Sequence, residues 1–325
     1  MKISFIVVSY NEKEYLKAAI DSCLSQEIWN EDKEAEVIIG DDGSDDGSIE
    51  LIKTMVAECP EQIKYFVMER AEPQIIIPPL RVSNVIKRAL AMASGDYIQI
   101  LSADDLLLDS KKASSAVGFL ENHPDYSCCY TDYKKFWDDG RDKYPGDKMH
   151  SFSRPVLWAL KYCHISCYVF RKSVTEDLLD RLCDDTGMFY SCYVSGKAKY
   201  LPGVSFGYRQ RSSGIMHSSD DIEKNIMELL LFQDTLNKGG YPKSTKARFC
   251  LPLIRVWKRR KSLPDNKFEK YMLESQKCDN DILGRVANYD RMHRMDKSKL
   301  CILMIKCGFY RAFFQCLGFW ESIIR

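Results

Sequence analysis

Two hydrophobic patterns alternate along the first hundred residues, and this alternation restricts the fold more than any other feature of the chain. Short apolar runs typical of strands lie at residues 3–9, 37–40, 63–68 and 97–101. Amphipathic helical patterns separate them, at residues 12–26, 48–58 and 80–93. Such alternation is typical of a mostly parallel sheet flanked by helices. We therefore predict an α/β fold for this part of the chain.

The pattern changes twice further along the chain. Between residues 102 and 215 it is less regular, with a polar loop at 138–149, helical patterns at 172–182 and 185–194, and strand-like runs at 126–133, 166–170, 198–201 and 204–210. Pro202-Gly203 separates the last two runs. Farther on only helical patterns remain, at 222–236, 253–261, 268–283 and 297–325. We predict one domain over residues 1–217 and a helical appendage over residues 218–325.

Composition and charge exclude several classes of protein. The chain of 325 residues has 47 basic and 46 acidic side chains, a balance that argues against nucleic-acid binding as its main task. The sequence contains no stretch of about 18 uncharged apolar residues, so we expect no membrane-spanning helix. The apolar run near residue 3 is too short for a signal peptide. The 13 cysteines are then expected to be reduced thiols. We expect a cytoplasmic protein with no nucleic-acid partner.

An acidic, glycine-containing turn directly follows the second predicted strand. Residues 41–48 read Asp-Asp-Gly-Ser-Asp-Asp-Gly-Ser. Ligands of open α/β sheets bind at the carboxyl ends of strands, and carboxylates gathered there need hydrogen-bond donors or a cation. The turn therefore predicts a ligand with N–H or hydroxyl groups, such as a nucleoside. The alternative is a solvated loop in which Asp45 or Asp46 caps a helix that begins near Ser48.

A second acidic cluster follows the fourth predicted strand. Here Ser102-Ala103-Asp104-Asp105 ends an apolar run, as the first cluster does. Parallel strands can bring both clusters to one crevice, where carboxylates and phosphate oxygens suit Mg²⁺ or Mn²⁺. The alternative is a helix cap before Leu106.

Four motifs in this order resemble family 2 glycosyltransferases of the GT-A fold. They are Val8-Ser9-Tyr10-Asn11, Asp41-Asp42-Gly43-Ser44, Asn84 with Gly95-Asp96-Tyr97, and Ala103-Asp104-Asp105. The resemblance covers about residues 1–215. It implies transfer of a sugar from a nucleotide-sugar, with UDP as the usual nucleotide and bacterial surface polysaccharide as the usual setting.

The resemblance also implies roles for individual residues. Val8, Ser9, Tyr10 and Asn11 would contact the nucleotide, and Asp41 or Asp42 would accept a hydrogen bond from the base. Asp104, beside Ala103, matches the family's metal-binding position, and Asp105 adjoins it. Arg81 and Asn84, spaced i, i+3 on one helix face, would line the diphosphate or nucleoside pocket; the alternative is a solvent-exposed face.

Two positions depart from the family pattern. Ser102 stands where the family's Asp-x-Asp motif begins, and Arg211 stands where the family often has a histidine that helps to bind metal and diphosphate. Arginine cannot ligate a cation, but it pairs bidentately with phosphate oxygens. We hypothesise that a protein cation takes over part of the metal's neutralising work. His217 is the alternative for the missing histidine, although an exposed loop position is favoured for it.

The general base is predicted from a further match. In the family an acidic pair opens a helix that ends in Gly-Lys and is followed by a strand with Tyr-Arg. Here the corresponding residues are Asp184-Asp185, Gly196-Lys197 and Tyr208-Arg209. The match puts Asp185 at the base position, with Asp184 as second choice. The alternative is that the pair only caps the helix.

The helical appendage carries a basic stretch and an apolar end. Nine basic and no acidic residues lie between Lys238 and Lys261, and the pattern at the end of the chain leaves only a narrow polar stripe. An anionic membrane surface, a lipid-linked acceptor or a solvated face fits the basic stretch. The apolar end fits burial in the core, a homodimer contact or a membrane boundary.

These observations together predict an inverting glycosyltransferase with Mg²⁺ or Mn²⁺ as cofactor. Because of Ser102, a second interpretation remains: the chain is a non-catalytic relative that binds nucleotide-sugar or scaffolds an assembly. A nucleotidyltransferase is a weaker alternative, because it would show a glycine-rich basic loop after the first strand, and residues 9–12 contain no glycine.

Overall fold

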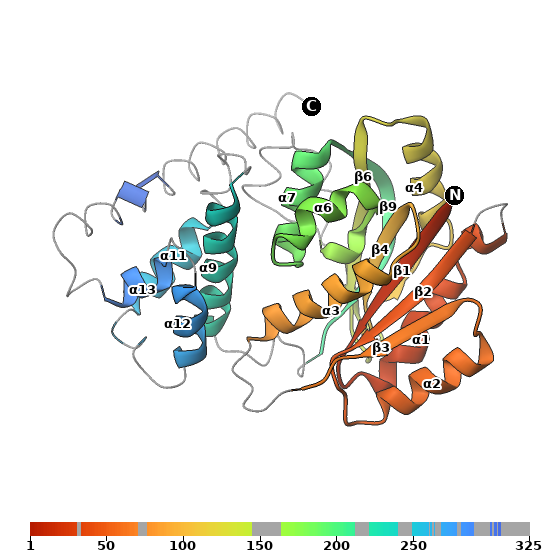
Figure 1. Cartoon of the computed structure of the whole chain (residues 1–325), viewed down its shortest axis with the longest axis horizontal. Helices are drawn as coiled ribbons and strands as arrows, with labels where there is room; N and C mark the ends of the chain where they lie inside the picture. The colour runs from red at the N-terminus through yellow and green to blue at the C-terminus, as the bar shows by residue number, and fades with distance from the viewer. Residues whose placement is uncertain are drawn as a thin grey trace. The chain divides into compact units, whose positions relative to one another are not determined.

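The structure is a computed structural model that describes two compact units. The first comprises residues 1–30, 34–70, 77–144 and 164–211. The second comprises the described residues from 221 onward, which are 221–239, 249–259, 261, 263, 268–277, 281–288, 300, 302–303 and 305–306. The predicted boundary between residues 217 and 218 lies outside the described residues. Figure 1 draws the elements of both units.

The first hundred residues form alternating strands and helices. They are β1 (Lys2–Ser9), α1 (Lys13–Leu24), a 3₁₀ turn (Glu27–Asn30), β2 (Glu34–Asp41), α2 (Ser48–Glu58), β3 (Ile63–Val67), α3 (Pro78–Met92) and β4 (Tyr97–Ser102). Each predicted strand and helix of this region is present, with its ends shifted by a few residues. Strands buried on both faces need nearly continuous apolar runs, and this explains the strength of the signal. The α/β prediction is confirmed.

The sheet has a parallel half and a mixed half. Its strand order is β3-β2-β1-β4-β8-β6-β9-β5, where β5 is Leu106–Leu107, β6 is Tyr126–Phe136, β8 is Tyr168–Arg171 and β9 is Lys197–Arg209. The first four strands of this order run parallel. Strand β8 is antiparallel to both of its neighbours, β4 and β6. Strands β6 and β9 run parallel to each other, and β5 is antiparallel to β9.

The second half of this unit also contains three helices and two 3₁₀ turns. The helices are α4 (Lys112–Asn122), α6 (Thr175–Leu179) and α7 (Asp185–Ser195), and the turns are Ile165–Cys167 and Lys172–Val174. Helix α4 has no counterpart among the predicted patterns. Part of the expected polar loop is the short strand β7 (Asp142–Lys143), which pairs with β6. The helix expected at 172–182 is shorter than predicted, because a 3₁₀ turn precedes α6.

The predicted break at Pro202-Gly203 is wrong, because β9 continues through it. Tyr200 lies opposite Tyr130 of β6 and Val204 lies opposite Asp132, so residues 201–203 together face a single residue of β6. This bulge leaves Pro202 and Gly203 exposed. Bulges are positions where a strand tolerates proline, and the ladder resumes beyond them.

The register of the parallel strands brings both acidic loops to the same edge. Ser9 lies opposite Asp41, and Val8 lies opposite Ser102. The loop after β2 begins with a hydrogen bond from Asp42 N to Ser9 O (2.9 Å), and the loop after β4 begins with one from Ala103 N to Val8 O (2.8 Å). The two loops therefore flank the turn that follows β1.

The second unit is helical in its described residues. It contains α9 (Asp221–Lys238), α11 (Cys250–Lys258), α12 (Glu269–Gln276) and α13 (Ile282–Ala287), and α9 contacts the other three. The rings of Phe232 and Phe249 stack in its core, with centroids 4.6 Å apart. The helix expected at 268–283 is two helices, because Asp281 Oδ1 accepts a hydrogen bond from Gly284 N (2.8 Å) and starts α13. Most of the expected helix at 297–325 lies outside the described residues.

None of the helices that the structure describes combines the length and the hydropathy needed to cross a bilayer.

Candidate active site

The turn after β1 joins the first acidic loop through Asn11. This residue has a φ of 52°, in the left-handed region that asparagine tolerates better than most side chains. Its N–H donates to Ser44 Oγ (2.8 Å), and its Oδ1 accepts from Asp45 N (3.0 Å). The turn thus holds the loop after β2 in a fixed position.

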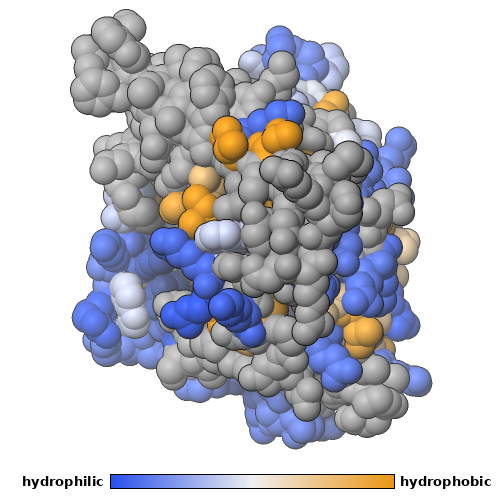
Figure 2. Space-filling view, turned by 90° about the vertical axis from the view of Figure 1, so that its left-hand side faces the viewer, coloured by the Kyte–Doolittle hydropathy of each residue, from blue (hydrophilic) through white to orange (hydrophobic). Residues whose placement is uncertain are grey.

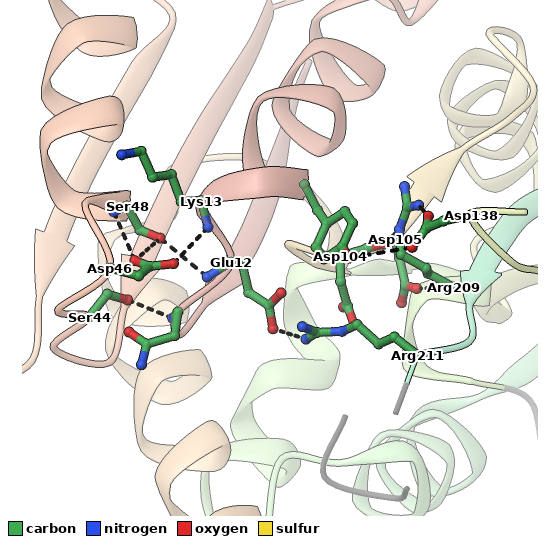
Figure 3. A network of polar contacts seen from close by, with 12 residues as sticks. Glu12, Lys13, Ser44, Asp46, Ser48, Asp104, Asp105, Asp138, Arg209 and Arg211 are labelled. Atoms are coloured by element: carbon green, nitrogen blue, oxygen red, sulfur yellow. Dashed lines mark hydrogen bonds and ion pairs between the residues drawn. The ribbon is translucent and has the colours of Figure 1, made fainter. Parts of the chain in front are cut away.

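Asp41 and Asp46 are used within the first acidic loop itself. Asp41 is fully buried, and its two carboxylate oxygens accept from Ser44 N (2.8 Å) and Ser44 Oγ (2.7 Å). Asp46 accepts from Lys13 N (3.0 Å) and from Ser48 N (2.9 Å), the first N–H groups of α1 and α2 (Figure 3). Asp46 thus binds the start of α2, as the alternative interpretation of the turn expects. These two carboxylates hold the loop and both helix starts together.

Asp42 is held differently, by two arginines from other elements. Its Oδ2 lies 2.8 Å from Arg81 Nε on α3 and 3.0 Å from Arg70 Nη2, just beyond β3. All three side chains are at most 19% exposed, so the pairs are shielded from water. The Arg70 guanidinium also lies 3.5 Å from the centroid of the Tyr10 ring. The result is a planar aromatic and guanidinium surface beside a carboxylate, a chemistry that fits a nucleobase.

The sequence analysis did not predict Arg70 as a site residue. It did predict Asn84, but no contact among the described residues supports a role for this side chain. The position of Arg70 just beyond β3 was the available signal, because ligand-binding residues follow the carboxyl ends of parallel strands. Asn84 is half-buried on α3, and its side-chain amide makes no hydrogen bond to the residues that the structure describes.

Asp105 belongs to the second acidic loop and is fully buried. Its Oδ1 accepts from Arg209 N (2.9 Å), and its Oδ2 has no hydrogen-bond partner among the described residues. Burial and the neighbouring charge of Asp104 raise the pKa of Asp105 well above its usual range. The helix-cap alternative is wrong for this loop, because Leu106 begins strand β5 rather than a helix.

Asp104 pairs with Arg211, which also reaches Glu12 (Figure 3). The distance from Arg211 Nε to Asp104 Oδ2 is 2.9 Å. The backbone carbonyl of Asp104 accepts from Arg209 Nε (2.8 Å), and Arg209 also forms an ion pair with Asp138. Glu12 is a second residue that the sequence predictions missed. It lies three residues beyond the end of β1, so the rule that identifies Arg70 would have found it as well.

The acidic pair before α7 divides into two roles. Asp184 is the N-cap, and its Oδ1 accepts from Gly187 N (2.8 Å). Asp185 Oδ1 accepts from Ile165 N (2.6 Å), and its Oδ2 accepts no hydrogen bond from the described residues. Burial and the negative charges of Asp105, Asp185 and Asp104 raise the pKa of Tyr208. The ring centroids of His164 and Tyr208 lie 5.0 Å apart; His164 precedes Ile165, and Tyr208 precedes Arg209, whose N–H donates to Asp105. These contacts put Asp185 in the same region as the second acidic loop.

The site offers oxygen ligands suited to a hard cation. Asp104 supplies a partly exposed carboxylate at the carboxyl ends of the strands, and buried oxygens of Asp105 and Glu12 have no partner among the described residues. Within the same described ranges no three His, Cys, Asp or Glu side chains converge as a complete metal site. The residues fit a cation held by one or two carboxylates that completes its shell with phosphate oxygens. His217 lies outside the described residues.

Residues 4–179, more than half of the chain, match glycosyl transferase family 2, and the chain belongs to this family. It is 30% identical to the putative glycosyltransferase EpsE of Bacillus subtilis over 286 residues, which cover 85% of this chain and 96% of EpsE. It is 27% identical to an uncharacterised Mycobacterium tuberculosis protein over 227 residues, 67% of this chain. That match spans 61% of the mycobacterial relative's length.

Solved structures share the fold at low sequence identity. Residues 1–349 of S. aureus TarS, crystallised with UDP-GlcNAc, give a TM-score of 0.58 at 16% identity, covering 99% of this chain and 91% of TarS. The Pyrobaculum calidifontis mannosyltransferase PcManGT, in complex with GDP-Man and Mn²⁺, gives 0.55 at 14% identity, covering 95% of this chain and 86% of that one. The predicted GT-A fold is confirmed, and the nucleotidyltransferase alternative loses its support.

Proposed function

We propose that this chain is an inverting glycosyltransferase that moves a hexosyl or N-acetylhexosaminyl group from a nucleotide-sugar to a hydroxyl of a glycan or lipid-linked acceptor. One observation carries the proposal. Asp42 with its two arginines and Asp104 lie on loops that start on either side of Ser9, and Asp185 accepts from Ile165 N beside the His164 ring, which packs on Tyr208 of β9. This arrangement supports a site in which the nucleoside, the diphosphate and the acceptor hydroxyl of one reaction meet.

The nucleoside half of the proposed site favours uracil. A uracil ring has one N–H between two carbonyl oxygens. The N–H fits the Asp42 carboxylate, and a carbonyl fits the guanidinium of Arg70 or Arg81 beside it. The buried hydroxyl of Ser9, at the end of β1, makes no hydrogen bond to the described residues and is a further donor or acceptor for the nucleoside. TarS and PcManGT carry UDP- and GDP-linked sugars on this fold, so the choice of UDP depends on these side chains.

Mg²⁺ or Mn²⁺ would be held by Asp104, with Asp105 beside it, and would supply positive charge for the diphosphate as it departs. The chain's own residues then set the geometry. Arg211 presents N–H groups that can bind diphosphate oxygens in pairs. Ala103 is buried, and its N–H donates to Val8 O (2.8 Å), which fixes the start of the loop that carries Asp104.

Asp185 is the proposed general base. The Ile165 N–H fixes one of its oxygens, and the other remains available for the proton of the acceptor hydroxyl. As that oxygen forms its bond to the anomeric carbon, the bond from this carbon to the diphosphate oxygen breaks. A single displacement inverts the anomeric configuration, so an α-linked donor gives a β-linked product.

A thermal-shift panel of UDP-, GDP- and CDP-sugars, with and without Mn²⁺, tests the donor. UDP-sugars should raise the melting temperature most, since a ligand that binds only the folded state stabilises it by mass action. An acceptor panel with NMR of the product anomer then tests the displacement. The Asp185→Asn enzyme should bind donor normally and transfer about 10²–10⁴-fold more slowly. Equal transfer by the Asn variant, or a retained anomeric configuration, would contradict the mechanism.

A non-catalytic relative is the second candidate, and Ser102 favours it because serine is a weak, uncharged ligand. Such a protein would bind UDP-sugar in the thermal-shift panel, yet it would neither hydrolyse nor transfer the sugar in the presence of Mn²⁺. Slow donor hydrolysis that Asp185→Asn lowers would exclude this candidate.

The helical unit supports a contact with the cytoplasmic face of a membrane. Arg255 and Lys258 of α11 and its C-cap Arg259 are exposed, and Leu251, one turn before Arg255, is 37% exposed. On the face drawn in Figure 2, small hydrophobic patches lie among hydrophilic residues. We expect co-sedimentation with phosphatidylglycerol vesicles that is lost with phosphatidylcholine, since each basic residue contributes about 1 kcal/mol near an anionic surface. A homodimer is the alternative use of this unit, and analytical ultracentrifugation distinguishes the two.

A further inference from the structure

Arg211 takes part in a bridge between two carboxylates that come from different strand ends. It follows β9, whereas Glu12 follows β1 and Asp104 follows β4. We propose, on the basis of the function proposed above, that Arg211 is the resident counter-ion of Glu12 and Asp104 in the donor-free enzyme. A divalent cation and this guanidinium then compete for Asp104 until the donor's diphosphate draws Arg211 to itself.

The bridge is shielded from water. The side chains of Arg211, Asp104 and Glu12 are 16%, 17% and 11% exposed. Charge pairs at this depth attract one another several times more strongly than pairs on the surface, because little solvent screens them. The bridge is therefore a contact that a competing cation must displace, rather than one that opens freely.

Glu12 and Asp104 need a positive partner whenever both are ionised. Glu12, Asp104 and the buried Asp105 meet here, and Glu12 Oε2 makes no hydrogen bond to the residues described. Arg209 is engaged by Asp138, by the Asp104 carbonyl and, through its own N–H, by Asp105. If Arg211 left without replacement, the like charges of Glu12 and Asp104 would face one another with little solvent between them.

A nucleoside diphosphate can exchange the partners without leaving a charge uncompensated. Its oxygens accept two parallel N–H bonds from a guanidinium, a geometry that matches arginine well. When Arg211 binds the diphosphate, Glu12 and Asp104 lose their counter-ion, and a divalent cation can take its place between them and the phosphate oxygens. Ser102 contributes no charge, so the balance between Arg211 and the cation decides whether the site binds metal.

The test is a titration of Mn²⁺ followed by electron paramagnetic resonance of the free ion, without nucleotide. We expect wild-type enzyme to bind Mn²⁺ weakly and Arg211→Gln to bind it at least about tenfold more tightly, because the competing charge is gone. Arg141→Gln removes the same charge from an exposed pair with Asp139 and should match wild type. Addition of UDP should tighten Mn²⁺ binding by the wild type and have a smaller effect on Arg211→Gln.

Equal Mn²⁺ affinity of wild type and Arg211→Gln without nucleotide would overturn the proposal. Circular dichroism melting tests whether each variant is folded. Arg211→Lys keeps the positive charge, so we expect it to bind Mn²⁺ as weakly as wild type does; this variant provides the test if Arg211→Gln does not fold. Tight Mn²⁺ binding by Arg211→Lys would equally contradict the counter-ion role. The proposed function is judged separately. Transfer from a UDP-sugar with equal Mn²⁺ affinities rejects only the competition, whereas failure to bind any nucleotide-sugar rejects the function.

Discussion

The two ends of the parallel half-sheet both bury carboxylates, but they treat them differently. At the amino end, Glu36 of β2 is 2% exposed, and its oxygens accept from Ser4 Oγ (2.7 Å), Ser94 N (2.8 Å) and Lys64 Nζ (2.8 Å). At the carboxyl end, Glu12 and Asp105 each keep a buried oxygen with no partner among the described residues. Burial of an acid is thus a weak sign of a functional site. A buried carboxylate oxygen without a hydrogen-bond partner is a stronger sign of a functional site. Burying it unpaired costs free energy, which a bound ligand can recover by supplying a partner.

The same contrast exists inside the carboxyl end. Asp41 and Asp46 are used by serine and backbone groups of their own loop and its neighbouring turn, whereas Asp42 and Asp104 are paired with arginines that a ligand can also bind. We therefore expect substitutions to separate into those that affect stability and those that affect catalysis, according to these partners.

The largest expected effect is at Asp104. Asp104→Asn should lower kcat/KM for transfer about a thousandfold, equivalent to about 4 kcal/mol, because the carboxylate that holds the cation at the diphosphate is lost. Its melting temperature should stay within a few degrees of wild type. A large fall in melting temperature, or a loss below tenfold, would show that the carboxyl end is structural like the amino end.

The next effect is at Glu36 and concerns stability alone. Burial would raise the pKa of Glu36, but Lys64, Ser4 and Ser94 outweigh it and lower the pKa from 4.5 to about 2. Such a group stabilises the fold above the unfolded pKa, and this contribution disappears as the pH falls through the folded value. Glu36→Gln should lose at most about 3 kcal/mol at pH 7 and much less near pH 2. Urea unfolding at several pH values measures this, and kcat of the folded fraction should be unchanged.

Asp41 tests whether one carboxylate of the carboxyl end behaves like Glu36. Asp41→Ala should destabilise the protein by about 2 kcal/mol, since it leaves the Ser44 N–H and hydroxyl without their acceptor. Asp45→Ala is the matched control, because that side chain is exposed. Chemical unfolding of both variants provides the measurement, and equal stabilities would remove Asp41 from the structural group.

The smallest effect is expected at Asp42. Asp42→Asn should weaken UDP binding about tenfold, because the neutral amide accepts the uracil N–H less strongly than a carboxylate does. Isothermal titration calorimetry with UDP and CDP gives the comparison. Unchanged discrimination between the two nucleotides would mean that Asp42 serves only to hold Arg70 and Arg81.

The sequence indicates positions along strands better than partners across loops. β1, β2 and β4 were predictable because buried parallel strands need continuous apolar runs, and Asp104 and Asp105 were found because they follow such a run. The contact of Asp46 with the start of α2 was one of the predicted alternatives, but the different uses of Asp41 and Asp42 were not predicted. The use of Asp42 depends on Arg70 and Arg81, which only the folded chain brings near.

Local signals failed where tertiary pairing overrides them. Pro202-Gly203 is typical of a chain reversal, yet β6 continues to pair with β9 on both sides of it. Glu12 and Arg70 were missed although both follow the carboxyl end of a parallel strand, because their ionic partners come from loops far away in the chain. The sequence showed that Ser102 and Arg211 depart from the family's motifs. Only the folded structure shows that Arg211 forms an ion pair with Asp104.

The bulge of β9 has a consequence for how this chain tolerates changes in length. Residues 201–203 already leave the ladder, so one residue more or less there changes only an exposed protrusion. Between Phe206 and Arg209 the strand pairs with β6 without interruption and, at Phe206 and Gly207, with β5 as well. A single insertion in that stretch would turn each following side chain to the opposite face and withdraw Arg209 and Arg211 from the acidic loop. Insertions and deletions in natural or engineered variants of β9 should therefore gather at its exposed kink.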